Sequence, residues 1–209
     1  MAGPSNASAN TKRLDLERRA FLDLMRMANT MAGPRELARQ LVVLAQHLSG
    51  CEAVAIRLKD GPDFPYAASL GFPEPFLVAE TELCAVDEEG HLLRDARRRP
   101  LLECMCGRVL RGPGEQGGAP LTDRGSFITS STTELLSSPA QVQTLGRTRN
   151  RCHLEGYETV ALFPIRRDGV TYGLIQCNDR RKGRLTAEAV DLMENFATTV
   201  AHLLQQAMA

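Results

Sequence analysis

The sequence predicts an α+β fold in which helices cover one face of an antiparallel sheet. Apolar residues recur at helical spacing near both ends of the chain, and apolar segments of strand length lie between them. The strands come in pairs joined by short glycine-containing turns, and hairpins rather than crossovers indicate antiparallel pairing. With 209 residues, 43% of them apolar, the chain is long enough for one domain with its own core.

The first half of the chain is expected to contain two long helices, a hairpin and a short helix. Pro34 opens the second helix, and Gly50 follows its end. An Asp-Gly-Pro turn joins the two strands of the hairpin. The predicted helices cover residues 13–30, 34–48 and 74–80, and the predicted strands cover residues 52–58 and 64–70.

The periodic pattern dissolves between residues 81 and 124. Glycine and proline interrupt this stretch repeatedly, and neither a helical nor a strand period persists. More than forty residues of poorly patterned chain are unusual inside one domain. We therefore expect a long irregular insert on the far face of the sheet, either flexible or held by something other than a continuous apolar face, such as a bound metal or cluster.

Regular structure is expected again after residue 124. An Arg-Arg-Asp-Gly turn joins the two strands of the clearest hairpin in the chain. A long closing helix follows, with Thr186 as its N-cap and Glu188 in its first turn. The predicted strands cover residues 125–130, 157–165 and 170–178, and the predicted helices cover residues 140–147 and 186–206.

Composition argues against several classes of partner. Lys+Arg and Asp+Glu number 25 each, so the zero net charge offers no electrostatic footprint for nucleic acid, and it favours self-association. No apolar run reaches the roughly 20 residues of a membrane span. Residues 1–12 are small and polar, which is typical of a disordered lead and not of a secretory signal. We therefore expect a cytoplasmic protein without a membrane or nucleic-acid partner.

Four of the six cysteines, Cys84, Cys104, Cys106 and Cys152, lie between residues 84 and 152. Cytoplasmic thiols stay reduced, so structural disulfides are poorly supported. Four thiolates suit tetrahedral zinc or an iron–sulfur cluster, and in a strand Cys104 and Cys106 would share one face. His153 could replace one thiol. Redox pairing and simple burial are the alternatives, and the other two cysteines are expected to be packing residues.

Several segments resemble a GAF domain. The hairpin Glu158-Thr-Val-Ala-Leu-Phe-Pro-Ile165 and Tyr172-Gly-Leu-Ile-Gln-Cys-Asn178 is similar to the last two strands of that fold. The motifs Leu102-Glu-Cys-Met-Cys-Gly107, Arg149-Asn-Arg-Cys-His-Leu-Glu-Gly-Tyr157 and Asn178-Asp-Arg-Arg181 resemble a bacterial subgroup that accompanies PAS modules and histidine kinases. The resemblance thus covers both the sheet and the insert.

The resemblance implies a sensory or regulatory domain over residues 31–209, not an enzyme. Members of the family bind cyclic nucleotides, bilins, haem, small anions or metal centres between the sheet and the insert. They often dimerise through their first and last helices, so helix 13–30 is expected to support a homodimer. No kinase, cyclase or DNA-binding module is evident in the sequence. We therefore expect the output to reach a separate protein, such as a histidine kinase or response regulator of a two-component system.

Five residues in or near these motifs are candidates for contact with a ligand: Arg149, Asn150, Arg151, Tyr157 and Asn178. The arginines suit a carboxylate or phosphate, could neutralise a thiolate-rich centre, or could lie on a solvated loop. Two other functions stay open. One is a ligand-free dimerisation or interaction module whose thiols only pack. The other is a GAF-type methionine sulfoxide reductase, which would use cysteines of the insert.

Overall fold

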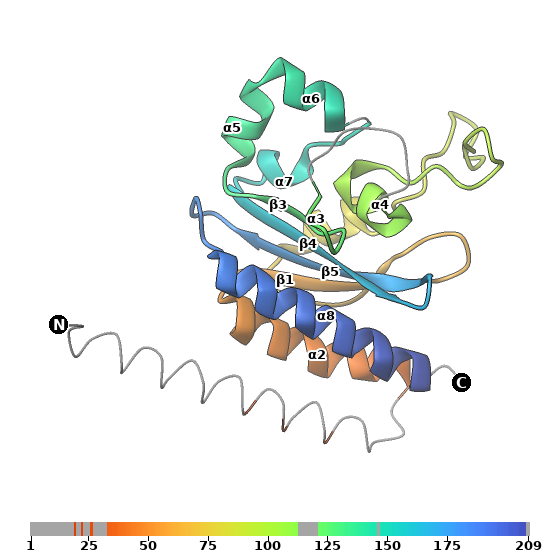
Figure 1. Ribbon diagram of the computed structural model, residues 1–209. Helices are drawn as coiled ribbons and strands as arrows, with labels where there is room; N and C mark the ends of the chain where they lie inside the picture. Colours follow the sequence, from red (N-terminus) through yellow and green to blue (C-terminus); the bar gives the residue numbers. More distant parts are fainter. Residues whose placement is uncertain are drawn as a thin grey trace.

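A five-stranded antiparallel sheet of order β2-β1-β5-β4-β3 lies at the centre of the computed structural model (Figure 1). The structure describes Arg19, Leu22, Arg26 and residues 33–112, 121–145 and 147–207. The strands are β1 (Ala53–Leu58), β2 (Tyr66–Leu70), β3 (Phe127–Thr129), β4 (Thr159–Arg167) and β5 (Val170–Asp179). Both predicted hairpins are present as β1–β2 and β4–β5, and the α+β class is confirmed.

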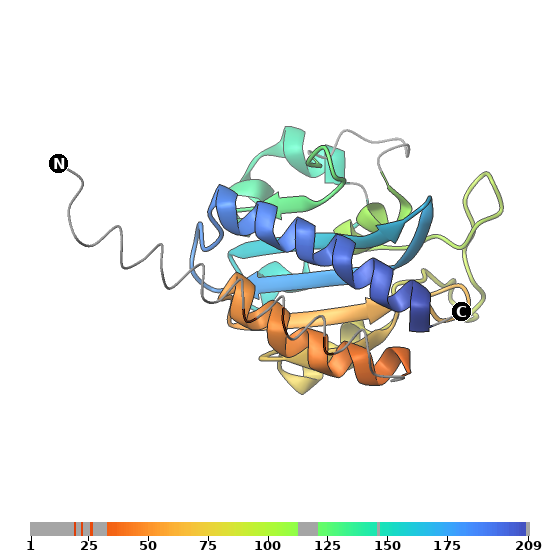
Figure 2. The ribbon, with the colours of Figure 1, turned by 60° about the horizontal axis from the view of Figure 1, so that its bottom comes forward.

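Two long helices, α2 (Pro34–Ser49) and α8 (Ala187–Ala207), lie side by side on one face of the sheet (Figure 2). The core between them and the strands includes Leu41, Phe163 and Met193, all fully buried. Helix α2 ends where predicted, because Gly50 takes a left-handed conformation with φ 60° and donates its N–H to the carbonyl of Gln46. The predicted packing of helices on one face is confirmed.

Five shorter helices cover the opposite face: α3 (Glu74–Glu80), α4 (Cys104–Arg111), α5 (Thr132–Ser137), α6 (Pro139–Leu145) and α7 (Arg151–Leu154). The prediction of an insert without regular structure is wrong for α4. Met105, Cys106, Val109 and Leu110 follow helical spacing and are all buried against the sheet. Helix α5 lies where no element was predicted, and Ser131 caps it by accepting the N–H of Glu134.

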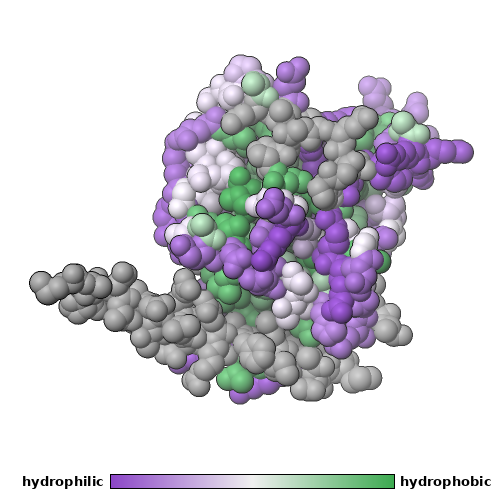
Figure 3. Space-filling model, viewed as in Figure 1, coloured by the Kyte–Doolittle hydropathy of each residue, from purple (hydrophilic) through white to green (hydrophobic). Residues whose placement is uncertain are grey.

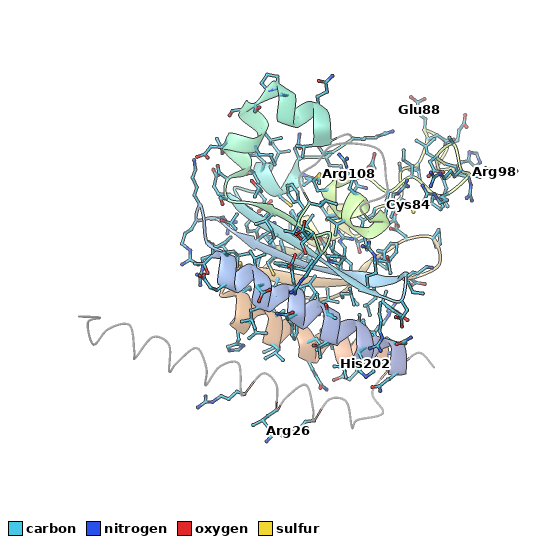
Figure 4. The ribbon with its side chains drawn as sticks, viewed as in Figure 1. Arg26, Cys84, Glu88, Arg98, Arg108 and His202 are labelled. Atoms are coloured by element: carbon cyan, nitrogen blue, oxygen red, sulfur yellow. The ribbon has the colours of Figure 1, made fainter. Side chains whose placement is uncertain are left out.

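Residues 83–103 form a narrow arm that projects from the body, with Glu88 and Arg98 at its outer end (Figure 4). Isolated strand bridges hold the arm together, including Cys84 with Leu102. Both carboxylate oxygens of Asp63 accept the N–H of Leu83 and so fasten its base. This part of the insert is therefore organised by its own backbone hydrogen bonds.

The predicted lead at residues 1–12 and most of the predicted helix at residues 13–30 lie outside the described residues. Arg19, Leu22 and Arg26 are described and are helical. Across the described ranges, no helix combines the length and apolar character that crossing a membrane requires.

Glu158 predicts a pH dependence of stability. Hydrogen bonds from Thr133 and Ser131 lower the pKa of Glu158 from its ordinary value of 4.5 to about 2. A carboxylate whose pKa is lowered by folding stabilises the protein above its unfolded pKa, and this contribution disappears as the pH falls. We expect Glu158→Gln to reduce the free energy of unfolding at pH 7 and to flatten its fall between pH 4.5 and 2. Denaturant titrations across that range would measure the free energy of unfolding of both proteins. The same dependence on pH in wild type and Glu158→Gln would contradict a lowered pKa for Glu158.

Candidate functional site

A pocket of about 70 Å³ lies between the sheet and helices α4 to α7. Figure 3 shows apolar residues in the middle of this layer, with polar residues around them. Its walls come from the sheet, from α4 and from α5 and α6, and their apolar residues are Met105, Phe127, Leu135, Leu136, Leu145, Val160 and Leu162. Three sulfurs also line it, those of Cys104, Cys106 and Cys152, and we call it the thiol pocket.

Three of the four predicted thiols therefore meet at one site. The sulfur of Cys104 accepts the backbone N–H of Arg149 at 3.2 Å, and that of Cys152 accepts Nε2 of Gln176 at 3.6 Å. Cys84 lies apart at the base of the arm (Figure 4), where its thiol donates to the carbonyl of Pro62 at 3.5 Å.

The residues present do not fit a four-thiol metal centre. Cys104 and Cys106 belong to helix α4 and not to a strand, and Cys84 lies apart from them at the base of the arm. In the described part of the chain, one set of three metal-ligand atoms lies within 4.8 Å, that of Asp87, Glu89 and His91 on an exposed turn of the arm. The zinc and iron–sulfur centres predicted on Cys84, Cys104, Cys106 and Cys152 are not assembled here, and metal binding stays a prediction.

The pocket thiols are held in their neutral form. Burial raises the pKa of Cys106 well above its ordinary value and that of Cys152 to about 12, although the buried Arg57 cation opposes both shifts. Burial also raises the pKa of Cys104, against the hydrogen bond from the Arg149 backbone. Since the thiolate is the reactive form, these cysteines are weak nucleophiles at neutral pH.

A network of amides forms the polar floor of the pocket. Nε2 of Gln176 donates to Oδ1 of Asn178 at 3.3 Å, and its Oε1 accepts the hydroxyl of Tyr66 at 3.1 Å. Nδ2 of Asn178 and the hydroxyl of Tyr157 are buried without a partner among the described residues. Gln176 is the member of this network that lines the pocket, so its amide is the group that could meet a ligand there.

The arginine cluster predicted to bind a ligand has a structural task. Arg149 pairs with Glu103 at 2.7 Å and with Glu80 at 3.4 Å, which ties α3 to α4. Arg151 and Asn150 line the thiol pocket. Arg149, Tyr157 and Asn178 are not among its lining residues, and Tyr157 and Asn178 are fully buried. As ligand contacts, all five residues stay predictions.

Sequence reasoning missed Gln176 and the pocket walls contributed by α5. A signal for Gln176 was present, because Gln176 and Asn178 alternate as polar residues within an otherwise apolar strand. Residues i and i+2 of a strand share a face, so both amides had to point into the same core. No comparable signal marks Leu135 and Leu136, whose helix begins in a Ser/Thr-rich segment.

The buried, neutral thiols predict slow chemistry. We expect Cys104, Cys106 and Cys152 to react with iodoacetamide in native protein at pH 7.5 at least about tenfold more slowly than in urea, because burial suppresses both access and the thiolate form. Peptide mass mapping would give the rate at each cysteine. Rapid native labelling of Cys152 would contradict this electrostatic assignment.

Comparison with known proteins identifies the class to which this fold and pocket belong. The GAF domain family model matches residues 33–204, so the chain belongs to the GAF domain family. Domains of this family are typically sensory or signalling domains. A search of curated proteins gave no match.

Several solved structures share the fold at low sequence identity. The GAF domain of a phosphoenolpyruvate-protein phosphotransferase from Coxiella burnetii is 14% identical, with a TM-score of 0.60 over 94% of both chains. A domain assigned to a two-component sensor histidine kinase protein from Sinorhizobium meliloti 1021 is 14% identical, with a TM-score of 0.53 over 83% of this chain and 92% of that chain. Part of a methyl-accepting chemotaxis protein is 16% identical, with a TM-score of 0.55 over 91% and 98%.

Proposed function

We propose that this GAF domain is a sensor that binds a small, largely uncharged ligand in the thiol pocket. The observation that carries the proposal is the pocket itself, with apolar walls, three neutral thiols and the side-chain amide of Gln176. Such a combination of apolar walls and a few convergent polar groups is typical of small-molecule sites.

The size of the pocket narrows the ligand class. Drug-sized ligands occupy pockets of roughly 300–1,000 Å³. The thiol pocket, at about 70 Å³, suits a molecule of a few heavy atoms in this conformation, and a bilin, haem or cyclic nucleotide would require α4 to α7 to move. The ligand we propose is therefore small and carries at most one or two hydrogen-bonding groups for the Gln176 amide.

A binding role is better supported than catalysis by the thiols. A reductase would need a thiolate nucleophile, whereas burial raises the pKa of Cys152 to about 12. A ligand-free interaction module is the principal alternative, in which the thiols pack as small apolar groups.

The sheet offers a route from the pocket to α2 and α8. Alternate residues of β4 face opposite sides: Leu162 lines the pocket, whereas Phe163 is packed in the core beneath α2 and α8. We propose that ligand binding shifts β4 and so alters the α2–α8 layer. That layer would act in a cytoplasmic homodimer or against a separate signalling protein, in line with the histidine kinase and chemotaxis proteins that contain similar domains.

A pocket-filling variant tests this coupling. Leu136→Trp places a large ring at a lining position, whereas Leu154→Trp makes the same change on α7 at a side chain that is 73% exposed. We expect Leu136→Trp to change amide hydrogen exchange in α2 and α8, and Leu154→Trp to leave both unchanged. Changes confined to α4 to α7 would contradict coupling through the sheet.

A further inference from the structure

A second cavity, of about 280 Å³, lies beside α8 at the open edge of β4. Strand β3 pairs with residues 160–162 of β4, and among the described residues the rest of β4 has no strand neighbour on this side. The cavity occupies that opening, between the segment 121–126, the β4–β5 turn and α8. Its polar lining residues are Arg124, Ser126, Arg166, Arg167, Asp168, Glu194 and Thr198.

Among the described residues, one arginine of this cavity is bonded to neutral groups rather than to a carboxylate. Arg167 pairs with Asp168 at 3.3 Å, and Arg124 lies 3.7 Å from Glu194. The guanidinium of Arg166 donates to the carbonyls of Val109 and Leu110 and to Thr171, all neutral groups. Burial lowers the pKa of Arg166, and no carboxylate acts against that shift. Arg124 and Arg167 thus have carboxylate partners, whereas Arg166 has none among the described residues.

Ser126 supplies an independent indication of a ligand. Its side chain is 1% exposed, and its hydroxyl has no partner in the described part of the chain although the residue lines the cavity. The backbone fixes it there, because its N–H donates to Oγ1 of Thr122, which itself donates to Glu194. A buried hydroxyl without a partner is costly unless a ligand accepts from it.

We propose that this cavity binds the oxyanion group of a small metabolite, a phosphate or a carboxylate. Guanidinium groups and a hydroxyl are the donors that such anions prefer, and the volume leaves room for an organic remainder. The site is separate from the thiol pocket and lies against α8. Arg124 also bonds Asp191 and Asn195 of α8, so an anion that recruits Arg124 weakens the tie between segment 121–126 and that helix.

Titration of the whole protein with inorganic phosphate, and separately with acetate, tests the proposal. Binding would be followed by calorimetry and by NMR at constant ionic strength with chloride as the reference. We expect at least one of the two anions to bind saturably. The anion that binds more tightly identifies the ligand's oxyanion as a phosphate or a carboxylate. Ser126→Ala should weaken it by about threefold to tenfold, the effect of one hydrogen bond. Glu194→Gln should tighten it by a similar factor, because a like charge is removed.

Arg39→Gln is the matched control, because it removes an exposed arginine of α2 far from the cavity lining. It should leave the affinity unchanged. The proposal is overturned if neither anion binds saturably, if Ser126→Ala binds as tightly as wild type, or if Glu194→Gln does not tighten binding. Circular dichroism of each variant confirms that weaker binding does not reflect unfolding.

Discussion

Replacing Arg57 by alanine is expected to lower the free energy of unfolding by about 3–5 kcal/mol. Arg57 is fully buried in β1, donates to the carbonyls of Phe64 and Thr81 at 2.9 Å each, and also donates to the carbonyl of Glu80. Its guanidinium lies 3.6 Å from the centre of the Tyr66 ring. The alanine variant leaves three carbonyls without their charged donor and opens a cavity beneath the thiol pocket.

Chemical denaturation measures this loss, with two variants for comparison. Arg39→Ala removes an exposed arginine of α2 and should change stability by less than about 0.5 kcal/mol. The stability loss of Arg57→Lys should lie between those of Arg39→Ala and Arg57→Ala. An ammonium keeps the charge but cannot reproduce the planar fork of donors. A loss below about 1 kcal/mol for Arg57→Ala would show that the buried cation does not hold these segments together.

Gly107→Ala is expected to destabilise α4 and to disturb the thiol pocket, although alanine is the better helix former by about 1 kcal/mol. A Cβ at position 107 would lie 2.6 Å from both Cβ and the carbonyl oxygen of Leu102. That backbone cannot yield cheaply, so α4 must move outward and carry Cys104 and Cys106 with it. We expect a net loss of about 2 kcal/mol, within the range for overpacking.

Gly33→Ala provides the matched control, because nothing lies within 4 Å of the corresponding Cβ and its backbone φ of −64° suits alanine. Its stability should stay within about 1 kcal/mol of wild type. For Gly107→Ala, faster alkylation of Cys106 should accompany the loss of stability. Unchanged or increased stability would mean that α4 does not pack against Leu102 as described.

Local patterns were sufficient to predict most of the fold. The turn at Asp168-Gly169 joins two strongly apolar strands, so the β4–β5 hairpin could be read directly. Helix α4 could not be predicted in this way, because its apolar stripe is short and contains Gly107. Only contact with the sheet stabilises this helix. The pairing of β1 with β5 depends on contacts distant in sequence, which no local pattern encodes.

The candidate site was predictable in part. The concentration of cysteines between residues 84 and 152 did locate the thiol pocket, since Cys104, Cys106 and Cys152 all line it. Their expected arrangement was wrong, because a strand was assumed where a helix forms. Spacing along the sequence could not show that Cys84 lies away from the other three cysteines. Its position is set by the strand bridges of the arm.

Native mass spectrometry of anaerobically purified protein, with elemental analysis of the same sample, tests the central claim most directly. We expect a small organic mass that is lost on denaturation, absent from Leu136→Trp and retained in Leu154→Trp, together with less than stoichiometric zinc or iron. An unliganded wild-type protein that gains no mass from a cell extract would support the ligand-free module. Stoichiometric metal in wild type that is absent from Cys106→Ser would instead support a thiol-ligated metal centre. Either result would contradict a small-molecule sensor.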